Sequence, residues 1–258
     1  MTPDSVEILA EFSRRHEVGY PMLSDVGGVV VEQYGILNPN IPPDAAGQRQ
    51  GLPFPGHFLL APDGSVLGKA FSGDLRHRPG GTLLVFEHFG GSGEPGVHIG
   101  TRELQADITC SNARLFPGQE LSLRIGLHIE PEWHLYGPAV ASPYVPLSIQ
   151  FEAGEDSVLA EQSFDVPAGV PVTLPSSGET LPLLSGSLEV KGRLRLRWSP
   201  PASRFPEMAA AVRARQGPTG DQRLQGTLRF QACSDSVCLP PVALGFSLPI
   251  FIEGHVAV

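Results

Sequence analysis

Cysteine is scarce in this sequence, and the little that is present comes late in the chain. Only three cysteines occur among 258 residues, and none precedes Cys110. Three cysteines are too few for the disulfide framework of a small secreted scaffold. No run of 18 apolar residues occurs either, so the sequence predicts no membrane-spanning helix.

The N-terminus lacks the pattern of a signal peptide. It reads Met-Thr-Pro-Asp-Ser-Val-Glu, with no basic region followed by an apolar stretch. If Met1 is the true start, we expect the chain to stay in the cytoplasm. If the natural start lies upstream, a periplasmic location is open.

The sequence has fewer basic than acidic residues. It contains 18 Lys and Arg and 27 Asp and Glu, which gives a net charge of −9. Such a chain is a poor partner for nucleic acid or for an anionic membrane surface. The hydrophobic content of 41% suffices for a sizeable core, while 30 glycines and 26 prolines favour short elements with many turns. The length fits one or two domains.

The first 89 residues predict alternating helices and strands. The pattern of apolar residues gives a helix over 6–15 capped by Asp4 or Ser5, and a second helix after Ser24-Asp25 with Val29 to Val31 and Tyr34 inward. A Pro-Asp-Gly turn separates two later strands. The remaining predicted elements are strands at 19–23, 56–61 and 65–71 and a helix at 81–88.

Three motifs in this region carry a family resemblance. They are Tyr20-Pro-Met-Leu-Ser-Asp25, Tyr34-Gly-Ile-Leu37, and Pro53-Phe-Pro-Gly-His-Phe-Leu-Leu60 followed by Pro-Asp-Gly. Residues 1–89 therefore resemble the C-terminal part of an AhpC/TSA (peroxiredoxin-like) redoxin, which implies an incomplete thioredoxin-fold α/β domain. Pro55 stands where thioredoxin-fold proteins place a cis-proline beside the active site. An ordinary trans turn proline is the alternative that the residues alone leave open.

The resemblance also implies what this region lacks. The catalytic cysteine of that family lies in the first β-α unit, upstream of all three motifs, and no cysteine precedes Cys110. We therefore expect no peroxidase activity from this half. Either catalysis has been lost or the natural chain begins further upstream, and we favour the second explanation.

A Gly/Ser-rich stretch at 90–97 predicts a linker, and the pattern beyond it changes to period two. Regularly spaced strands separated by turns predict an antiparallel β-sandwich over 98–256. A basic row of Lys191, Arg193, Arg195 and Arg197 is typical of a solvated sheet face. The predicted strands cover 121–129, 145–151, 188–198, 224–230 and 244–252, with a short helix at 207–215.

Two of the three cysteines, Cys233 and Cys238, follow a predicted strand with four residues between them and precede Pro240-Pro241. This pattern suits a disulfide that opens and closes, and a structural staple remains the alternative. A short loop stabilises by only about 2 kcal/mol, which a domain of this size hardly needs. A zinc site would need further ligands. Asp235 would raise a thiol pKa, so attack by a partner's thiolate is favoured over self-activation.

The aromatic motif Trp133-His-Leu-Tyr-Gly-Pro138 is open to two interpretations. Its side chains can pack as core at the end of a strand, or they can wall a thiol site and shield a disulfide.

Taken together, residues 131–137 and 230–241 resemble the N-terminal domain of the thiol:disulfide interchange protein DsbD family. The resemblance implies an immunoglobulin-like sandwich in which Cys233 and Cys238 exchange electrons with a thioredoxin-like or other thiol protein, without a metal or cofactor. The candidates that line the site are Trp133, His134, Tyr136, Asp235 and Pro55. This chain has one residue fewer between the cysteines than the best-known member.

The sequence thus predicts a thiol-disulfide redox relay in the antioxidant or disulfide-interchange class. The alternative is a non-catalytic binding module with a structural disulfide and a redoxin remnant. Cys110 has no matching role and is expected to be a small buried residue.

Overall fold

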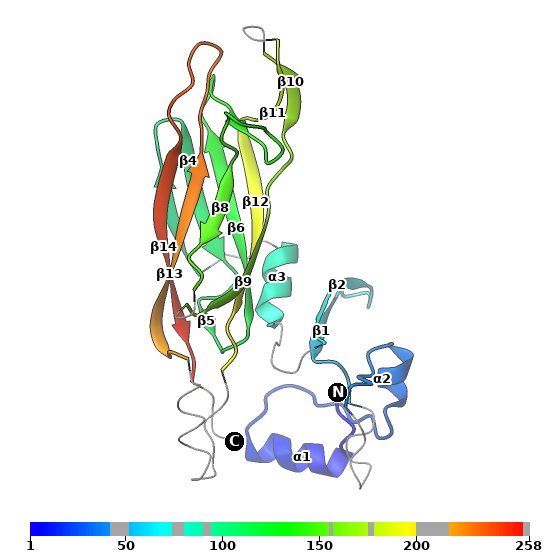
Figure 1. Cartoon of the computed structure of the whole chain (residues 1–258). Coiled ribbons are helices and arrows are strands. Elements are labelled where there is room, and N and C mark those ends of the chain that lie inside the picture. Colours follow the sequence, from blue (N-terminus) through cyan, green and yellow to red (C-terminus); the bar gives the residue numbers. More distant parts are fainter. Residues whose placement is uncertain are drawn as a thin grey trace. The chain divides into compact units, whose positions relative to one another are not determined.

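The computed structural model describes residues 1–41, 52–73, 80–89, 94–154, 157–174, 178–199 and 217–254 (Figure 1). Contacts divide the chain into two units. The first comprises Met1–Phe58 with Lys69–Pro79, and the second comprises Leu59–Gly68 with Gly80–Val258. The predicted limits of 1–89, 90–97 and 98–256 are a different division, and they stay predictions.

The two helices of the first unit begin where local capping allows. Helix α1 covers Val6–Arg15, as predicted, and the Ser5 hydroxyl accepts from the Ile8 N–H at 3.4 Å. Helix α2 is short, at Val29–Gln33. The Asp25 carboxylate accepts from the N–H groups of Val30 (3.1 Å) and Val31 (2.8 Å), which satisfies two donors of the first turn.

The strand predicted at 19–23 is wrong. That segment carries no ladder in the structure, and next to it only an isolated bridge joins Thr2 to Ser24. Its apolar residues suited a strand, but a strand requires a neighbour along its length. The other elements predicted here are confirmed: β1 (Gly56–Leu60) and β2 (Val66–Phe71) form a two-stranded sheet, and α3 covers Gly81–Phe89.

Pro55 differs from the expectation of a cis-proline. The described part of the chain has its cis peptide bond at Ser142-Pro143, and the bond before Pro55 is trans. The Pro55 carbonyl accepts from the Ser72 N–H at 3.0 Å. Pro55 is therefore an ordinary turn proline in the first unit.

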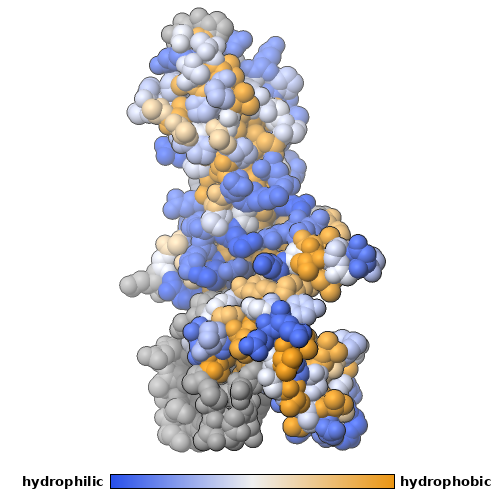
Figure 2. All heavy atoms as spheres, turned by 90° about the vertical axis from the view of Figure 1, so that its right-hand side faces the viewer, coloured by the Kyte–Doolittle hydropathy of each residue, from blue (hydrophilic) through white to orange (hydrophobic). Residues whose placement is uncertain are grey.

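The first unit keeps many apolar side chains at the surface. Tyr20, Val26 and Val6 are each at least 66% exposed, whereas Leu9 and Val31 are buried. Apolar patches stand out among polar ones in the space-filling view (Figure 2). The apolar positions that define a helix or a turn in the sequence are thus only partly covered within this unit.

Between Glu94 and Ile252, the described residues of the second unit form three sheets (Figure 1). The five-stranded sheet has the order β3 (Glu94–Gly100), β4 (Leu104–Cys110), β6 (Glu120–Ile129), β12 (Ser187–Leu196) and β9 (Leu159–Asp165). The four-stranded sheet has the order β5 (Arg114–Leu115), β14 (Val242–Ile252), β13 (Gly220–Phe230) and β8 (Ser148–Phe151). The small sheet has the order β10 (Val170–Thr173), β11 (Thr180–Leu184) and β7 (Leu135–Tyr136).

One core joins the two larger sheets, which confirms the predicted sandwich. Alternate residues of each strand point inward, so Ile125 of β6 and Leu228 and Phe230 of β13 are fully buried in the same cluster. Cys110 lies in this core at 1% exposure, as expected for a small buried residue. The immunoglobulin-like topology stays a prediction.

Two details differ from the sequence-based expectations for this unit. Strand β3 begins at Glu94, inside the predicted linker, because its backbone pairs with β4. In the basic row, Lys191, Arg193 and Arg197 are exposed, but Arg195 is half-buried and contacts Glu120 and Glu161. The helix predicted at 207–215 lies outside the described residues.

A disulfide loop at the end of the sandwich

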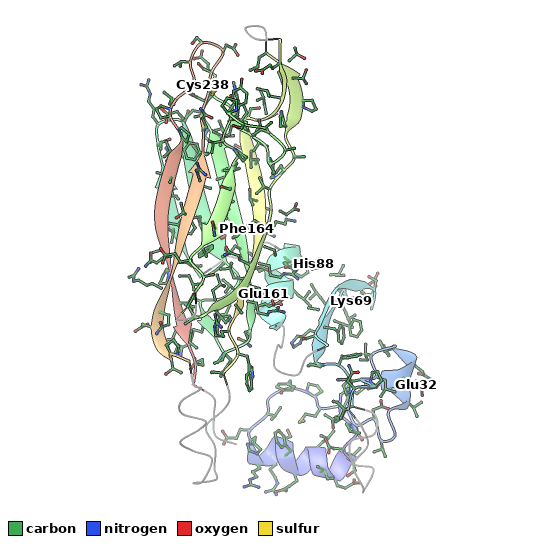
Figure 3. The ribbon with its side chains drawn as sticks, in the orientation of Figure 1. Glu32, Lys69, His88, Glu161, Phe164 and Cys238 are labelled. Atoms are coloured by element: carbon green, nitrogen blue, oxygen red, sulfur yellow. A yellow bond between two sulfur atoms is a disulfide. The ribbon has the colours of Figure 1, made fainter. Side chains whose placement is uncertain are left out.

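The two cysteines form a disulfide in the loop that joins β13 to β14 (Figure 3). Cys233 follows the end of β13 by three residues, and Cys238 precedes the start of β14 by four. Within the loop, the Ser234 N–H donates to Val237 O at 2.8 Å, and the Val237 N–H donates to the Ser234 hydroxyl at 3.2 Å. These bonds close a tight turn that brings the two cysteine backbones to 4.1 Å between Cα atoms.

Gln231 holds the base of this loop. Its side-chain amide donates to Leu239 O at 3.1 Å, and its side-chain carbonyl accepts from the Val145 N–H at 3.1 Å. The Leu239 N–H also donates to Ala232 O at 3.0 Å. Gln231 opens the cysteine motif in the sequence, but only the fold brings Val145 within its reach.

The two sulfur-bearing residues differ sharply in accessibility. Cys233 is 1% exposed and belongs to a small buried cluster with Tyr136 and Leu183. Cys238 is exposed at the loop surface. Solvent therefore reaches the Cys238 half of the disulfide, while the Cys233 half is covered.

Tyr136 provides a hydrogen-bond donor to the buried sulfur. Its hydroxyl donates to Cys233 Sγ at 3.0 Å and lies 3.7 Å from Cys238 Sγ. Burial, followed by the charges of Tyr144 and Glu179, raises the pKa of Tyr136 to about 12. The phenol therefore keeps its proton across the physiological range and remains a donor to sulfur.

The sequence analysis missed two residues near Tyr136, which are Tyr144 and Glu179. The rings of Tyr136 and Tyr144 pack with centroids 4.8 Å apart, and the Tyr144 hydroxyl donates to the Glu179 carboxylate at 2.6 Å. That hydrogen bond, then burial, raises the pKa of Tyr144. Neither residue lies in a recognisable motif, so only the pairing of β11 with β7 reveals them.

The aromatic motif agrees in part with each of the two interpretations from the sequence, core packing and the wall of a thiol site. Trp133 and Leu135 pack in or against the main core, whereas His134 is buried and Tyr136 joins the cluster with Cys233. This division follows from the alternation of side chains along extended backbone. A Cβ at Gly137 would come within 2.1 Å of Ala168 O, so glycine is required for the close approach that ends this segment.

His134 lies directly across from Cys233. The His134 N–H donates to Cys233 O at 2.9 Å, and the Cys233 N–H donates to His134 O at 3.0 Å. Burial lowers the pKa of His134, and the charge of the exposed Asp235 acts in the opposite direction with a smaller effect. The predicted residues Cys233, Cys238, His134, Tyr136 and Asp235 are thus brought together.

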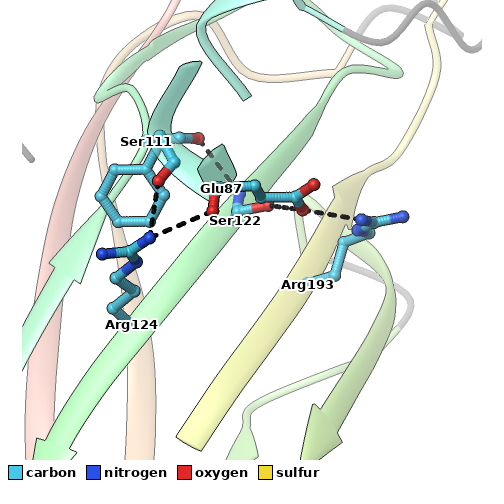
Figure 4. A network of polar contacts seen from close by, with 6 residues as sticks. Glu87, Ser111, Ser122, Arg124 and Arg193 are labelled. Atoms are coloured by element: carbon cyan, nitrogen blue, oxygen red, sulfur yellow. Dashed lines mark hydrogen bonds and ion pairs between the residues drawn. The ribbon is translucent and has the colours of Figure 1, made fainter. Parts of the chain in front are cut away.

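A second polar cluster in this unit holds helix α3 against the five-stranded sheet (Figure 4). The Glu87 carboxylate accepts from the Ser122 hydroxyl and from the Arg193 guanidinium, each at 2.7 Å. Arg124 donates to Phe86 O at 2.8 Å, which satisfies a carbonyl at the end of the helix. These residues line a cleft of about 550 Å³.

The described residues contain no group of three or more His, Cys, Asp or Glu side chains that could hold a metal ion. Among the helices that the structure describes, none combines the length and the apolar character needed to cross a membrane.

Helices α1 and α2, strand β1 and the first half of β2 match a known family. Residues 1–68 match the AhpC/TSA family. The match confirms the first resemblance over these residues, although it ends before α3. The AhpC/TSA segment contains no cysteine.

Two solved structures are similar to parts of the chain. The crystal structure of the N-terminal periplasmic domain of ScsB from Proteus mirabilis matches with a TM-score of 0.39 and 13% identity, covering 60% of this chain and 49% of that one. A family 123 glycoside hydrolase from Clostridium perfringens matches with a TM-score of 0.16 and 11% identity, covering 55% of this chain and 23% of that one. The chain thus spans about half the length of the first structure, and TM-scores this low carry no argument. No curated protein matches the chain.

Proposed function

We propose that this chain is a thiol-disulfide exchange protein that uses Cys233 and Cys238 as its reactive pair. One observation carries the proposal: the disulfide joins an exposed sulfur-bearing residue to a buried one that already accepts a hydrogen bond from Tyr136. A static staple needs neither the accessible half nor the donor. The AhpC/TSA match supports a redox context for the chain.

The exchange begins at the accessible residue. A thiolate of a thioredoxin-like or other thiol protein attacks Cys238 Sγ, the bond between the cysteines breaks, and its electron pair goes to Cys233 Sγ. The Tyr136 hydroxyl stabilises the thiolate that forms there. A second thiol of the partner then attacks the partner's own sulfur in the mixed disulfide, which releases Cys238 as a thiolate. The partner is oxidised and this chain is reduced, and the reverse sequence returns the electrons.

The test is a redox titration of the full chain against glutathione, with the reduced fraction read by alkylation and mass. We expect a midpoint potential above about −300 mV, the range of labile disulfides. A Cys233→Ala variant should also trap a partner as a mixed disulfide at Cys238. A pair that stays oxidised well below that potential would contradict the proposal.

A second candidate function is a binding module with a static disulfide. It is favoured by β10, an edge strand of the small sheet whose four residues are all exposed, so that its free edge could pair with an extended segment of a partner. The redox titration separates the two candidates, because only the exchange protein requires a reducible pair.

A further inference from the structure

One polar group beside the disulfide has no partner. His134 is 8% exposed, and its Nε2 is buried without a hydrogen-bond partner among the residues that the structure describes. A buried polar atom without a partner costs free energy relative to one that is paired. The exchange step proposed above makes no use of this nitrogen.

The backbone sets this imidazole beside the sulfur that leaves. His134 and Cys233 exchange both of their backbone hydrogen bonds, so they form a directly opposed cross-strand pair. Side chains of such a pair leave the same face of the ladder, with Cβ atoms roughly 5 Å apart. Tyr136, two residues further on, leaves that face too, and its hydroxyl reaches Cys233 Sγ. The imidazole therefore leaves the same face of the backbone pair as Cys233 Sγ and the phenol that donates to it.

The charges around His134 come from several elements. Asp235 approaches from the cysteine loop, and Tyr136 packs edge-on against the imidazole with ring centroids 5.7 Å apart. The charges of Tyr144 and Glu179 raise the pKa of Tyr136. In the oxidised protein the imidazole faces no charged sulfur, and burial lowers its pKa, so it is neutral at neutral pH. Opening the disulfide changes this balance.

We propose that His134 takes up a proton when Cys233 becomes a thiolate, so that opening of the disulfide is coupled to protonation of a buried imidazole. The inference rests on the proposed exchange function. It assigns His134 as a positioning residue that acts on the reacting disulfide through Cys233. The imidazolium and the thiolate would then form a buried ion pair that neither partner forms while the disulfide is closed.

Electrons and protons balance across the reaction. The partner's first thiol loses its proton to solvent and attacks Cys238 Sγ, and the electron pair of the broken bond goes to Cys233 Sγ. One proton from solvent binds His134. The partner's second thiol then loses its proton to solvent and attacks the partner's own sulfur, and a proton from solvent binds the Cys238 thiolate that is released. Two electrons and two protons have then moved from the partner's dithiol to this chain.

The experiment measures the rate at which dithiothreitol reduces the disulfide of the full chain between about pH 5 and pH 8, divided by the fraction of reductant present as thiolate. An imidazolium beside the leaving sulfur accelerates attack. In the wild type we therefore expect the rate per thiolate to rise roughly tenfold as pH falls through the pKa of His134. In His134→Gln and His134→Phe the rate per thiolate should not change with pH. His134→Phe also keeps an aromatic ring packed on Tyr136.

The control variant is His98→Gln. His98 is another histidine of the second unit, and it contacts Asp107 and Gln105. Its hydrogen bond to Asp107 raises its pKa, so it titrates in the same experiment without a role at the sulfur. This variant should keep the wild-type profile.

A measurement on the unmodified chain covers the case in which a His134 variant does not fold. Proton NMR of the imidazole should give a higher pKa for His134 in the reduced protein than in the oxidised one. Equal pKa values, or a wild-type profile retained by both His134 variants, would overturn this inference while leaving exchange intact. A disulfide that dithiothreitol does not reduce at any pH would instead overturn the proposed function.

Discussion

Two polar clusters of the second unit contain similar contacts in different surroundings. In the sulfur cluster, formed by Tyr136, Cys233 and Cys238, the donor and the acceptor are at most 1% exposed. In the helix cluster, formed by Glu87, Ser122 and Arg193, the Arg193 side chain is 50% exposed. Water competes for hydrogen bonds in the helix cluster but not for the donor to the buried sulfur. Burial therefore keeps water away from the hydrogen bond of the sulfur cluster, while the helix cluster holds α3 to the sheet in contact with water.

The largest effect is expected from the exposed cysteine. Cys238→Ser removes the sulfur that a partner reaches, so exchange should be lost completely in an assay of dithiothreitol oxidation or partner reduction. The matched control is Cys110→Ala, which alters a buried cysteine of the core and should leave exchange intact. Residual exchange in Cys238→Ser would mean that the Cys233 thiol reacts with a partner's disulfide on its own.

The next largest effect is expected from Tyr136→Phe. The variant keeps the ring but loses the donor to Cys233 Sγ. A hydrogen bond to a charged group contributes about 1.5–3 kcal/mol, and part of that charge has developed at the transition state. We expect reduction of the disulfide to slow roughly tenfold.

Tyr144→Phe is the control for this effect, since its hydroxyl contacts Glu179 and not sulfur. It should change the rate by less than about threefold, because it acts on the sulfur only through Tyr136. Equal losses in the two variants would indicate a general disturbance of packing in place of a specific donor.

A smaller effect is expected from the helix cluster. Glu87→Gln keeps the shape of the side chain but removes the charge that faces Arg193. Because the pair is partly exposed, we expect a loss of about 1 kcal/mol or less in the free energy of unfolding by urea. Exchange should be unchanged, and a slower exchange would link the helix cluster to the disulfide.

The smallest effect is the pH dependence of that same contact. Burial raises the pKa of Glu87, but the hydrogen bonds from Ser122 and Arg193 and the charges of Arg193 and His88 outweigh it, so the net pKa is lowered. A lowered pKa stabilises the fold above the unfolded value of about 4.3, and this contribution disappears as pH falls through the folded value. The stability difference between wild type and Glu87→Gln should therefore shrink below about pH 4.3. A difference that is constant with pH would contradict the pairing.

Local rules were enough to predict much of the fold. The capping and apolar spacing of residues 4–15 gave α1 with the observed ends, and period two gave the long strands of the sandwich. The same local rules failed at 19–23, where apolar residues suit a strand but no neighbour pairs with them along their length. The two-residue strand β7 was also missed, because so short a segment has no measurable period.

The candidate site was predictable in its residues but not in its arrangement. The cysteine spacing and the aromatic motif singled out Cys233, Cys238, His134 and Tyr136. Which aromatic residue faces sulfur depends on the register of β7 against the cysteine loop, and that register is a property of the fold. The contrast in accessibility between the cysteines and the contact of Tyr144 with Glu179 likewise require three dimensions.

The pairing of β13 with β14 bears on the lifetime of the reduced protein. The two strands pair continuously from Gly220 opposite Ile252 to Phe230 opposite Val242. Next to the end of this ladder, the Gln231 side chain donates to Leu239 O and so joins the two ends of the loop. Opening the disulfide frees only the few residues between these anchors. An exposed loop tip is a site at which proteases cut, but the flanking ladder limits how far this loop can open in either redox state. We therefore expect the reduced and oxidised forms to resist digestion equally well, so that repeated turnover does not shorten the protein's survival.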